Sequence, residues 1–174
     1  MSWTELLNRE IESTYRVTSR LLDLVDDDAL DWKPRTGSNW MTIGQLLRHL
    51  TDACGASIRG FVTGDWGLPE GMDISKLPPE EMLPPAEKMP AIGSVAETRI
   101  LLEADRQTAL AMLKQCSEKR LAKEKAPAPW DDSPMILGHR LLQMVEHLKQ
   151  HKSQLFYYLK LQGKPVNTLH LWGE

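Results

Sequence analysis

Residues 133–163, SPMILGHRLLQMVEHLKQHKSQLFYYLKLQG, form the longest stretch of the chain with an uninterrupted helical pattern. Ser133 at the start is a preferred N-cap residue, and Pro134 is a preferred first residue of a helix. Gly163 and then Pro165 end the pattern, because glycine favours the turn after a helix and proline cannot continue one. The sequence therefore predicts a single long helix over this stretch.

Three earlier segments share the 3.6-residue period of apolar side chains, and no segment shows a convincing period of two. Two of them begin with the S/T-x-x-E/Q capping box, which satisfies two otherwise unpaired backbone donors. Gly60 is expected to end the second of the three segments. The segments are residues 4–25, residues 42–59 with the box Thr42–Gln45, and residues 94–118 with the box Ser94–Glu97.

The connection over residues 61–93 contains six prolines, which exclude a long helix there, yet it is too apolar for a disordered linker. A connection of this length can cross from one end of a bundle to the other. We therefore predict an all-α fold: a four-helix bundle with a long Pro-rich crossover between helices 2 and 3. Residues 1–174 are predicted to form one domain, since 174 residues suit a single core.

The composition excludes several classes of function. The formal net charge is −3, so no basic surface is implied and nucleic acid is not an expected partner. Apolar runs are too short to span a membrane, and the acidic N-terminal residues do not resemble a signal peptide. The two cysteines, Cys54 and Cys116, form no disulfide framework, which indicates a reducing, cytoplasmic location.

Three of the five histidines are candidates for a metal site. His147 and His151 are four residues apart, a spacing that places both imidazoles on one helix face. His49 lies on a mostly apolar stripe of the second predicted helix. Each observation has an alternative: histidine pairs also occur on solvated helix faces, and a lone histidine in a core is more often simply hydrogen-bonded. A bundle that brings the two helices into register favours the metal site.

Two segments resemble the DinB/YfiT-like family. The first is MTIGQLLRHL at 41–50, preceded by WKPRTGSNW, with a Pro-containing loop, a Trp, a capped helix start and a histidine. The second is EHLKQHKSQLFYYLKLQGKPV at 146–166, with H-x-x-x-H, a Gln three residues later and a Gly-x-Pro exit. Both motifs stand in the expected order, and the resemblance covers residues 1–166.

The resemblance implies a four-helix bundle in which His49, His147 and His151 hold one divalent transition metal, with zinc and nickel as the leading candidates. It also implies a small-molecule substrate and a low-molecular-weight thiol, because characterised relatives include metal-dependent thiol S-transferases. Three imidazoles leave coordination positions open, as in catalytic zinc sites, so a hydrolase is equally compatible. The alternative is a non-catalytic metal- or ligand-binding bundle, which the absence of an evident general base favours.

Four further side chains are candidates for the pocket or for support of the ligands. Asp105 faces inward on the third predicted helix and is a candidate base, ligand partner or fourth ligand. The favoured interpretation is a salt bridge to Arg48 or Arg140, or simple exposure at the end of the helix. The four candidates are Asp105, Arg140, Gln154 and Tyr158.

Many relatives are dimers, and the surplus of tryptophan together with the apolar 61–93 segment predicts a homodimer.

Overall fold

The computed structural model describes residues 1–69, 72, 76–78 and 84–173. Within these residues the chain has two isolated β-bridges and no strand, so the prediction of an all-α fold is confirmed. The helices are α1 (Trp3–Leu22), the 3-10 turn η1 (Asp27–Ala29), α2 (Ile43–Leu50), α3 (Gly55–Thr63), the 3-10 turn η3 (Ala86–Lys88), α5 (Val95–Lys114), α6 (Glu118–Lys123), α7 (Leu137–Leu161) and α8 (Thr168–Trp172).

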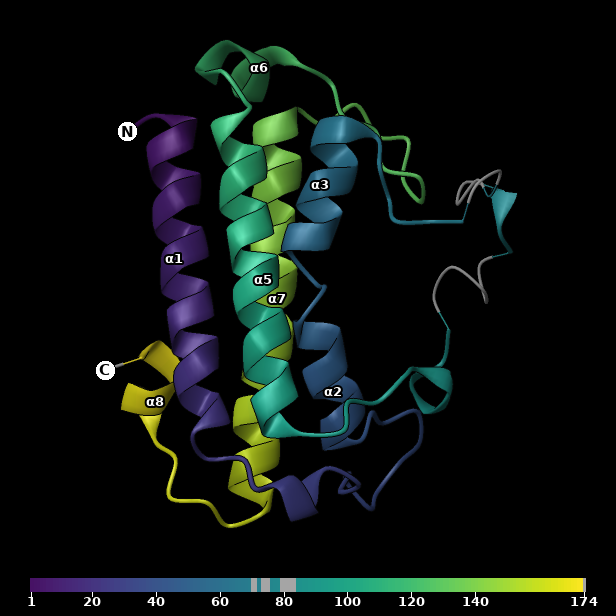
Figure 1. The fold of residues 1–174 in the computed structure, drawn as a ribbon, viewed down its shortest axis with the longest axis vertical. Helices are drawn as coiled ribbons and strands as arrows, with labels where there is room; N and C mark the ends of the chain where they lie inside the picture. The colour runs from purple at the N-terminus through teal and green to yellow at the C-terminus, as the bar shows by residue number, and fades with distance from the viewer. Residues whose placement is uncertain (70–71, 73–75, 79–83, 174) are drawn as a thin grey trace.

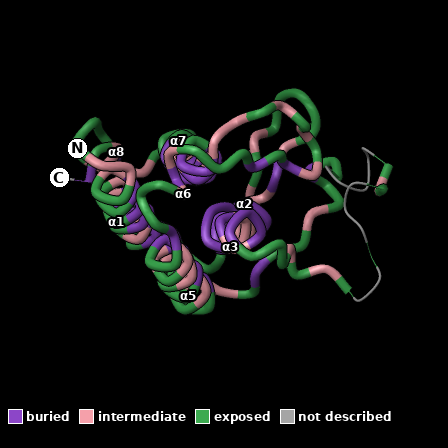
Figure 2. The backbone as a smooth tube through the Cα atoms, turned by 90° about the horizontal axis from the view of Figure 1, so that it is seen from above, coloured by how far each residue is buried: buried purple, intermediate pink, exposed green. Residues whose placement is uncertain are grey.

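The long helices α1, α5 and α7 run side by side, and α2 and α3 together form the fourth column of the bundle (Figure 1). Viewed from above, the buried surfaces of these helices face one another (Figure 2). Buried side chains, most of them apolar, recur every three or four residues on the long helices, so one stripe of each is withdrawn from water. Core residues from this stripe include Leu7, Ile11, Leu46, Leu50, Leu141, Leu148 and Leu155. No helix of the described residues is long and apolar enough to cross a membrane.

The predicted crossover spans the bundle. Helix α3 ends at the same end of the bundle as the start of α1, whereas α5 begins at the opposite end (Figure 1). The described parts of the connection pack as the apolar composition predicts. The centroids of the Trp66 and Phe61 rings are 5.0 Å apart, and Ala86 is buried. Residues 79–83 lie outside the described residues, so the expectation that proline excludes a helix there is not tested by them.

The prediction of one continuous helix over 42–59 is wrong. The Thr42–Gln45 capping box forms as expected, but α2 ends at Leu50, a turn follows, and a new helix begins at Gly55. This second helix runs through Gly60 to Thr63, and its C-cap is Gly64 with φ 79°. Gly60 lies inside this helix, and its missing side chain leaves room for the Trp66 ring.

The predicted start of the last helix at Ser133 is also wrong, since α7 begins at Leu137. The Ser133 hydroxyl is already engaged: it donates to Asp131 at 2.8 Å and accepts from Arg140 at 3.0 Å. The backbone of residues 124–137 pairs with itself through Ala126 N–Met135 O and Leu137 N–Glu124 O bonds. These contacts hold the segment before α7 in an extended hairpin, so it cannot join the helix.

Helix α5 begins after Ser94 as predicted, and the Ser94 hydroxyl accepts from the Glu97 amide at 3.1 Å. The second half of the expected capping box is absent, because the Glu97 carboxylate accepts from the Gly93 amide instead. The helix ends at Lys114 rather than near Glu118. Ser117 then caps the short helix α6, which lies in the connection between α5 and α7.

Candidate metal centre

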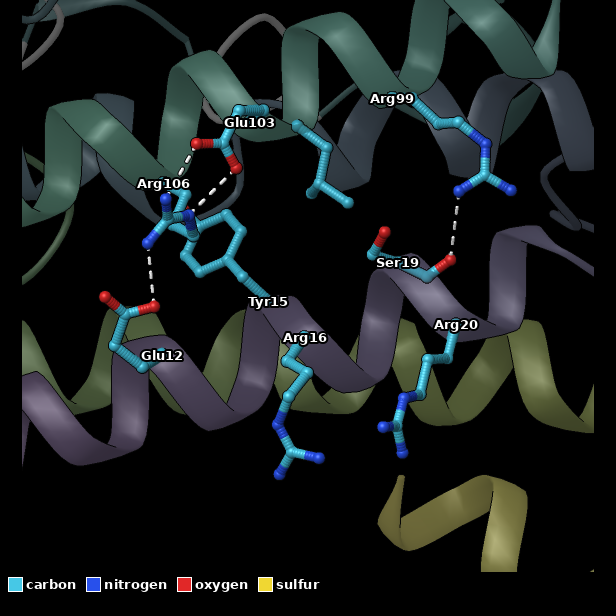
Figure 3. Close-up of a pocket in the computed structure, with 9 residues that line it drawn as sticks. Glu12, Tyr15, Arg16, Ser19, Arg20, Arg99, Glu103 and Arg106 are labelled. Atoms are coloured by element: carbon cyan, nitrogen blue, oxygen red, sulfur yellow. Dashed lines mark hydrogen bonds and ion pairs between the residues drawn. The ribbon is translucent and has the colours of Figure 1, made fainter. Parts of the chain in front are cut away.

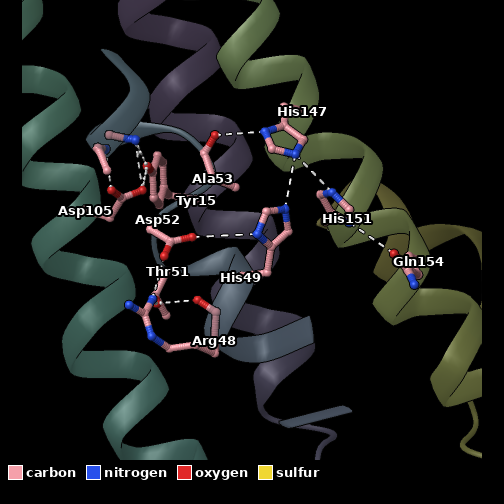
Figure 4. A network of polar contacts seen from close by, with 12 residues as sticks. Tyr15, Arg48, His49, Thr51, Asp52, Ala53, Asp105, His147, His151 and Gln154 are labelled. Carbon is pink, nitrogen blue, oxygen red and sulfur yellow. Dashed lines mark hydrogen bonds and ion pairs between the residues drawn. The ribbon is translucent and has the colours of Figure 1, made fainter. Parts of the chain in front are cut away.

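The structure brings His49, His147 and His151 together in one cluster (Figure 4). His49 lies in the last turn of α2, and the other two lie one turn apart on the facing side of α7. The Nε2 atom of His147 is 3.2 Å from the Nε2 atom of His49 and 3.0 Å from that of His151. The three rings therefore direct the same nitrogen toward a common point.

The opposite ring nitrogen, Nδ1, of each histidine faces an acceptor. His147 Nδ1 lies 3.1 Å from the Ala53 carbonyl oxygen, and His151 Nδ1 lies 3.0 Å from Gln154 Oε1. His49 Nδ1 is 3.7 Å from Asp52 Oδ1, an electrostatic contact longer than a hydrogen bond. Because a neutral imidazole carries one proton, these acceptors place it on Nδ1 and leave Nε2 as an acceptor.

Burial keeps the three imidazoles neutral. It lowers the pKa of His49 to about 3, with a further contribution from the neighbouring His151 and His147 rings. Burial also lowers the pKa of His147 and of His151 below the usual value for histidine. Near neutral pH the cluster is thus three uncharged bases, the protonation state that metal binding requires.

The donor set fits a transition metal. Two nitrogens that each lie ~2.1 Å from one zinc ion are separated by about 3.4 Å in a tetrahedral site and about 3.0 Å in an octahedral site. The observed Nε2 separations of 3.0 and 3.2 Å lie in this interval. Three converging lone pairs have no proton to share among themselves, so a cation is the partner that satisfies them together. Among the described residues, no other His, Cys, Asp or Glu joins the group.

Sequence reasoning missed two parts of this cluster, the Ala53 carbonyl and Asp52. The carbonyl is available because the backbone turns between α2 and α3, a break that the helical pattern of 42–59 conceals. Asp52 stands three residues after His49, in the turn that follows α2, and this short spacing is visible in the sequence. Its carboxylate also accepts from Arg48 at 2.7 Å. Burial raises the pKa of Asp52.

The structure places Asp105 beside the start of α3 and does not include it in the histidine group. Its carboxylate accepts from the Tyr15 hydroxyl at 2.6 Å and from the amides of Gly55 at 2.9 Å and Ala56 at 2.8 Å. Cys54, the N-cap residue, makes no side-chain cap of its own. Asp105 therefore caps α3 from a neighbouring helix, and the predicted salt bridge to an arginine does not form, since Arg48 contacts Asp52.

Arg140 is buried, but it belongs to another part of the fold. Its guanidinium donates to the Ala126 carbonyl at 2.9 Å, to the Asp131 carboxylate at 2.8 Å and to Ser133. It thereby fixes the segment before α7. Gln154 and Tyr158, in contrast, are connected to the cluster: Gln154 contacts His151, and Tyr158 contacts Gln154 at 3.0 Å.

The two remaining histidines are elsewhere. His139 is exposed near the start of α7. His170 lies in α8, where its ring nitrogen accepts from the Asn167 amide in a local capping interaction. Neither belongs to the group of three.

A separate groove of about 490 Å³ lies between α1 and α5 (Figure 3). The arginine side chains that line it already donate to protein acceptors. These contacts connect α1 with α5 and with the C-terminal residues. The contacts are Arg106 with Glu12 and Glu103, Arg99 with Asp23 and the Ser19 carbonyl, and both Arg16 and Arg20 with the Gly173 carbonyl.

Comparison with protein families identifies the class of protein that this bundle and its histidines define. The model of the DinB superfamily matches residues 10–155, most of the chain. The chain belongs to the DinB superfamily. Comparisons with curated proteins and with solved structures returned no match.

Proposed function

We propose that the protein binds one divalent transition metal through His49, His147 and His151, with zinc or nickel as the expected ion. The observation that carries this proposal is the convergence of three Nε2 atoms at separations of 3.0 and 3.2 Å, each ring having its outer nitrogen turned to an acceptor. Membership of the DinB superfamily supports it.

We further propose that the metal serves catalysis, in a thiol S-transferase or a hydrolase acting on a small molecule. A divalent metal held by the three neutral imidazoles would supply Lewis acidity and would lower the pKa of a thiol or water toward neutrality. The group of three lacks a fourth protein ligand among the described residues, which supports open positions for such a nucleophile. The three imidazoles would hold the ion, and the Asp52 carboxylate, 3.7 Å from His49 Nδ1, would hold a proton beside His49.

A pocket of about 670 Å³ supports a small-molecule substrate. The three histidines do not line it, but its walls include Gln154, whose amide oxygen contacts His151, together with the rings of Trp40, Tyr157 and Tyr158. This volume is typical of ligand sites. Its aromatic walls suit the apolar part of an electrophile.

The non-catalytic alternative is favoured by one specific observation. Asp52 is held by Arg48 through a 2.7 Å ion pair, which competes with a role as general base. A metal-binding bundle without catalysis would retain all three histidines and the same acceptors. Metal content therefore tests the site, and a rate assay tests the chemistry.

The first experiment is metal analysis of protein purified without a histidine tag. We expect close to one equivalent of a transition metal per chain. Replacement of any one of His49, His147 or His151 by Ala is expected to remove most of it. His139→Ala and His170→Ala are the matched controls and are expected to retain it; equal loss from all five variants would reject this set of ligands.

The second experiment measures transfer of bacillithiol, mycothiol, glutathione or cysteine to chlorinated nitroaromatics and epoxides. We expect a rate that disappears on chelation and returns with zinc or nickel. A metal-loaded protein with no rate above background for any thiol, and no metal-dependent ester hydrolysis, would favour the binding bundle.

We also propose that residues 1–174 act as one domain, as a homodimer and in the cytoplasm. The surplus of tryptophan and the apolar 61–93 segment support a dimer, and both Cys54 and Cys116 are free and buried, as a reducing compartment allows. Light scattering at micromolar concentration is expected to return about twice the chain mass of 19.8 kDa. A mass of one chain would reject the dimer.

A further inference from the structure

A chain of three hydrogen bonds connects the His151 ring to the backbone at the start of α2. The Tyr158 hydroxyl donates to the Met41 carbonyl at 3.1 Å. The same hydroxyl oxygen accepts from the Gln154 amide Nε2 at 3.0 Å. Gln154 Oε1 in turn faces His151 Nδ1 at 3.0 Å.

The direction of this chain is fixed at its backbone end. A carbonyl oxygen can only accept a hydrogen bond, so the Tyr158 hydroxyl must donate its proton to the Met41 carbonyl. The tyrosine oxygen can then accept from the NH₂ group of Gln154, and this contact orients the amide. The amide oxygen of Gln154 consequently points at His151 and requires a proton on Nδ1. A free Gln amide can adopt two orientations, and a free neutral imidazole can adopt two tautomers. In this chain each hydrogen bond selects one of the two states of the next group.

The surroundings of Tyr158 make its hydroxyl a fixed reference point. The side chain is 2% exposed. The Trp32 and Trp40 rings both lie edge-to-face with the Tyr158 ring, at centroid distances of 5.4 Å and 6.2 Å. Met41 immediately precedes the Thr42 cap of α2, the helix that carries His49. The chain therefore joins the two helices that contribute the ligands.

We propose that Tyr158 and Gln154 are positioning residues that hold His151 as the Nδ1–H tautomer, with its Nε2 lone pair free for the metal. The functional role of this tautomer rests on the proposed metal site. The tautomer itself is a property of the metal-free protein and is measurable without any metal. Tyr158 acts entirely through Gln154, so the two side chains form one unit.

The first test is long-range ¹H–¹⁵N correlation NMR of the histidine rings in metal-free protein. In the unmodified chain we expect the proton of His151 on Nδ1. Gln154→Ala is expected to release it, so that the Nε2–H form is populated, whereas Gln150→Ala, at an exposed glutamine on the same helix, is expected to leave it on Nδ1. An unchanged His151 tautomer in Gln154→Ala would overturn the proposal.

The second test is zinc affinity measured by competition with a chelator. Loss of such a supporting hydrogen bond typically weakens metal binding about 10–100-fold, the range we expect for Gln154→Ala. Tyr158→Phe is expected to weaken binding less, and the double variant no more than Gln154→Ala alone. Tyr157→Phe, which removes an exposed hydroxyl one residue away, is the matched control and is expected to bind zinc normally.

A conservative variant separates positioning from packing. Gln154→Glu presents an acceptor in either orientation of its carboxylate, so it is expected to restore the Nδ1–H tautomer and the affinity. In that background Tyr158→Phe is expected to have little further effect, because no amide remains to be oriented. Independent, additive losses from the two positions would overturn the proposal. Absence of zinc binding by the unmodified protein would reject the metal site, while the NMR result would still decide the tautomer.

Discussion

Asp105 illustrates which part of a site a sequence can predict at the scale of one residue. Its inward orientation follows from the helical period and is confirmed by an exposure of 6%. Its partners do not follow, because the amides of Gly55 and Ala56 become available only where the backbone starts a new helix. Tyr15, which lies 90 residues away in sequence, supplies the third donor. Such donors are set by tertiary packing and leave no local pattern.

Asp105→Ala is predicted to destabilise the protein strongly. It leaves the Ala56 amide and the Tyr15 hydroxyl without their acceptor in a buried place, and the Gly55 amide keeps only the Tyr15 oxygen at 3.2 Å. A single unsatisfied buried group costs about 1–3 kcal/mol. We expect a loss on the order of 3 kcal/mol in the free energy of unfolding, measured by urea denaturation. Glu103→Ala, an exposed carboxylate on the same helix, is the control and should cost less than about 1 kcal/mol. Equal losses would contradict the capping role.

The break between α2 and α3 is the main difference between prediction and structure at the scale of elements. The apolar stripe continues through the break, so periodicity alone indicates one helix. The sequence does contain weak signals, since Thr51, Asp52 and Gly55 are all poor residues for a helix interior. The break has a consequence for the cluster, because it turns the Ala53 carbonyl toward His147. A regular helix would use that carbonyl for its own hydrogen bond.

Gly55→Ala is predicted to disrupt this junction. A Cβ atom at Gly55 would lie 2.0 Å from the Asp105 carbonyl oxygen, a distance that requires α3 and α5 to separate. We expect a loss of more than about 3 kcal/mol, the upper range for forced overpacking. The control is Gly163→Ala, where φ is 78° but nothing lies within 4 Å, so only backbone strain of about 1 kcal/mol is expected. Chemical denaturation of both variants makes the comparison, and similar stabilities would contradict the close approach.

At the scale of the whole molecule, the helical periods and the Pro-rich connection predicted the bundle and its crossover. They did not determine the register of α2 against α7, which decides whether His49 meets His147 and His151. Register arises from the packing of entire helix faces, and the chain of bonds through Tyr158 contributes to it. The three histidines were chosen from spacing and family resemblance, and the structure brings those three together.

Metal removal is therefore predicted to weaken the entire fold. The proposed ligands come from two helices, with 98 residues between His49 and His147, and an unfolded chain does not hold them together. An ion that binds the native state alone stabilises it by about 2.7 kcal/mol at a free concentration of 100 times its Kd. For a chain of this size that corresponds to a rise in Tm of roughly 5–10 °C.

Calorimetry of the metal-free protein, before and after saturation with zinc, measures this shift. We expect chelation to reverse it. His147→Ala is expected to show no shift, because its Nε2 is the atom close to both other ligands, whereas His139→Ala is expected to show the full shift. Zinc that binds with micromolar affinity but leaves the Tm unchanged would mean that the ion binds the unfolded chain equally well. In that case the native convergence of the three imidazoles would not be the source of the affinity.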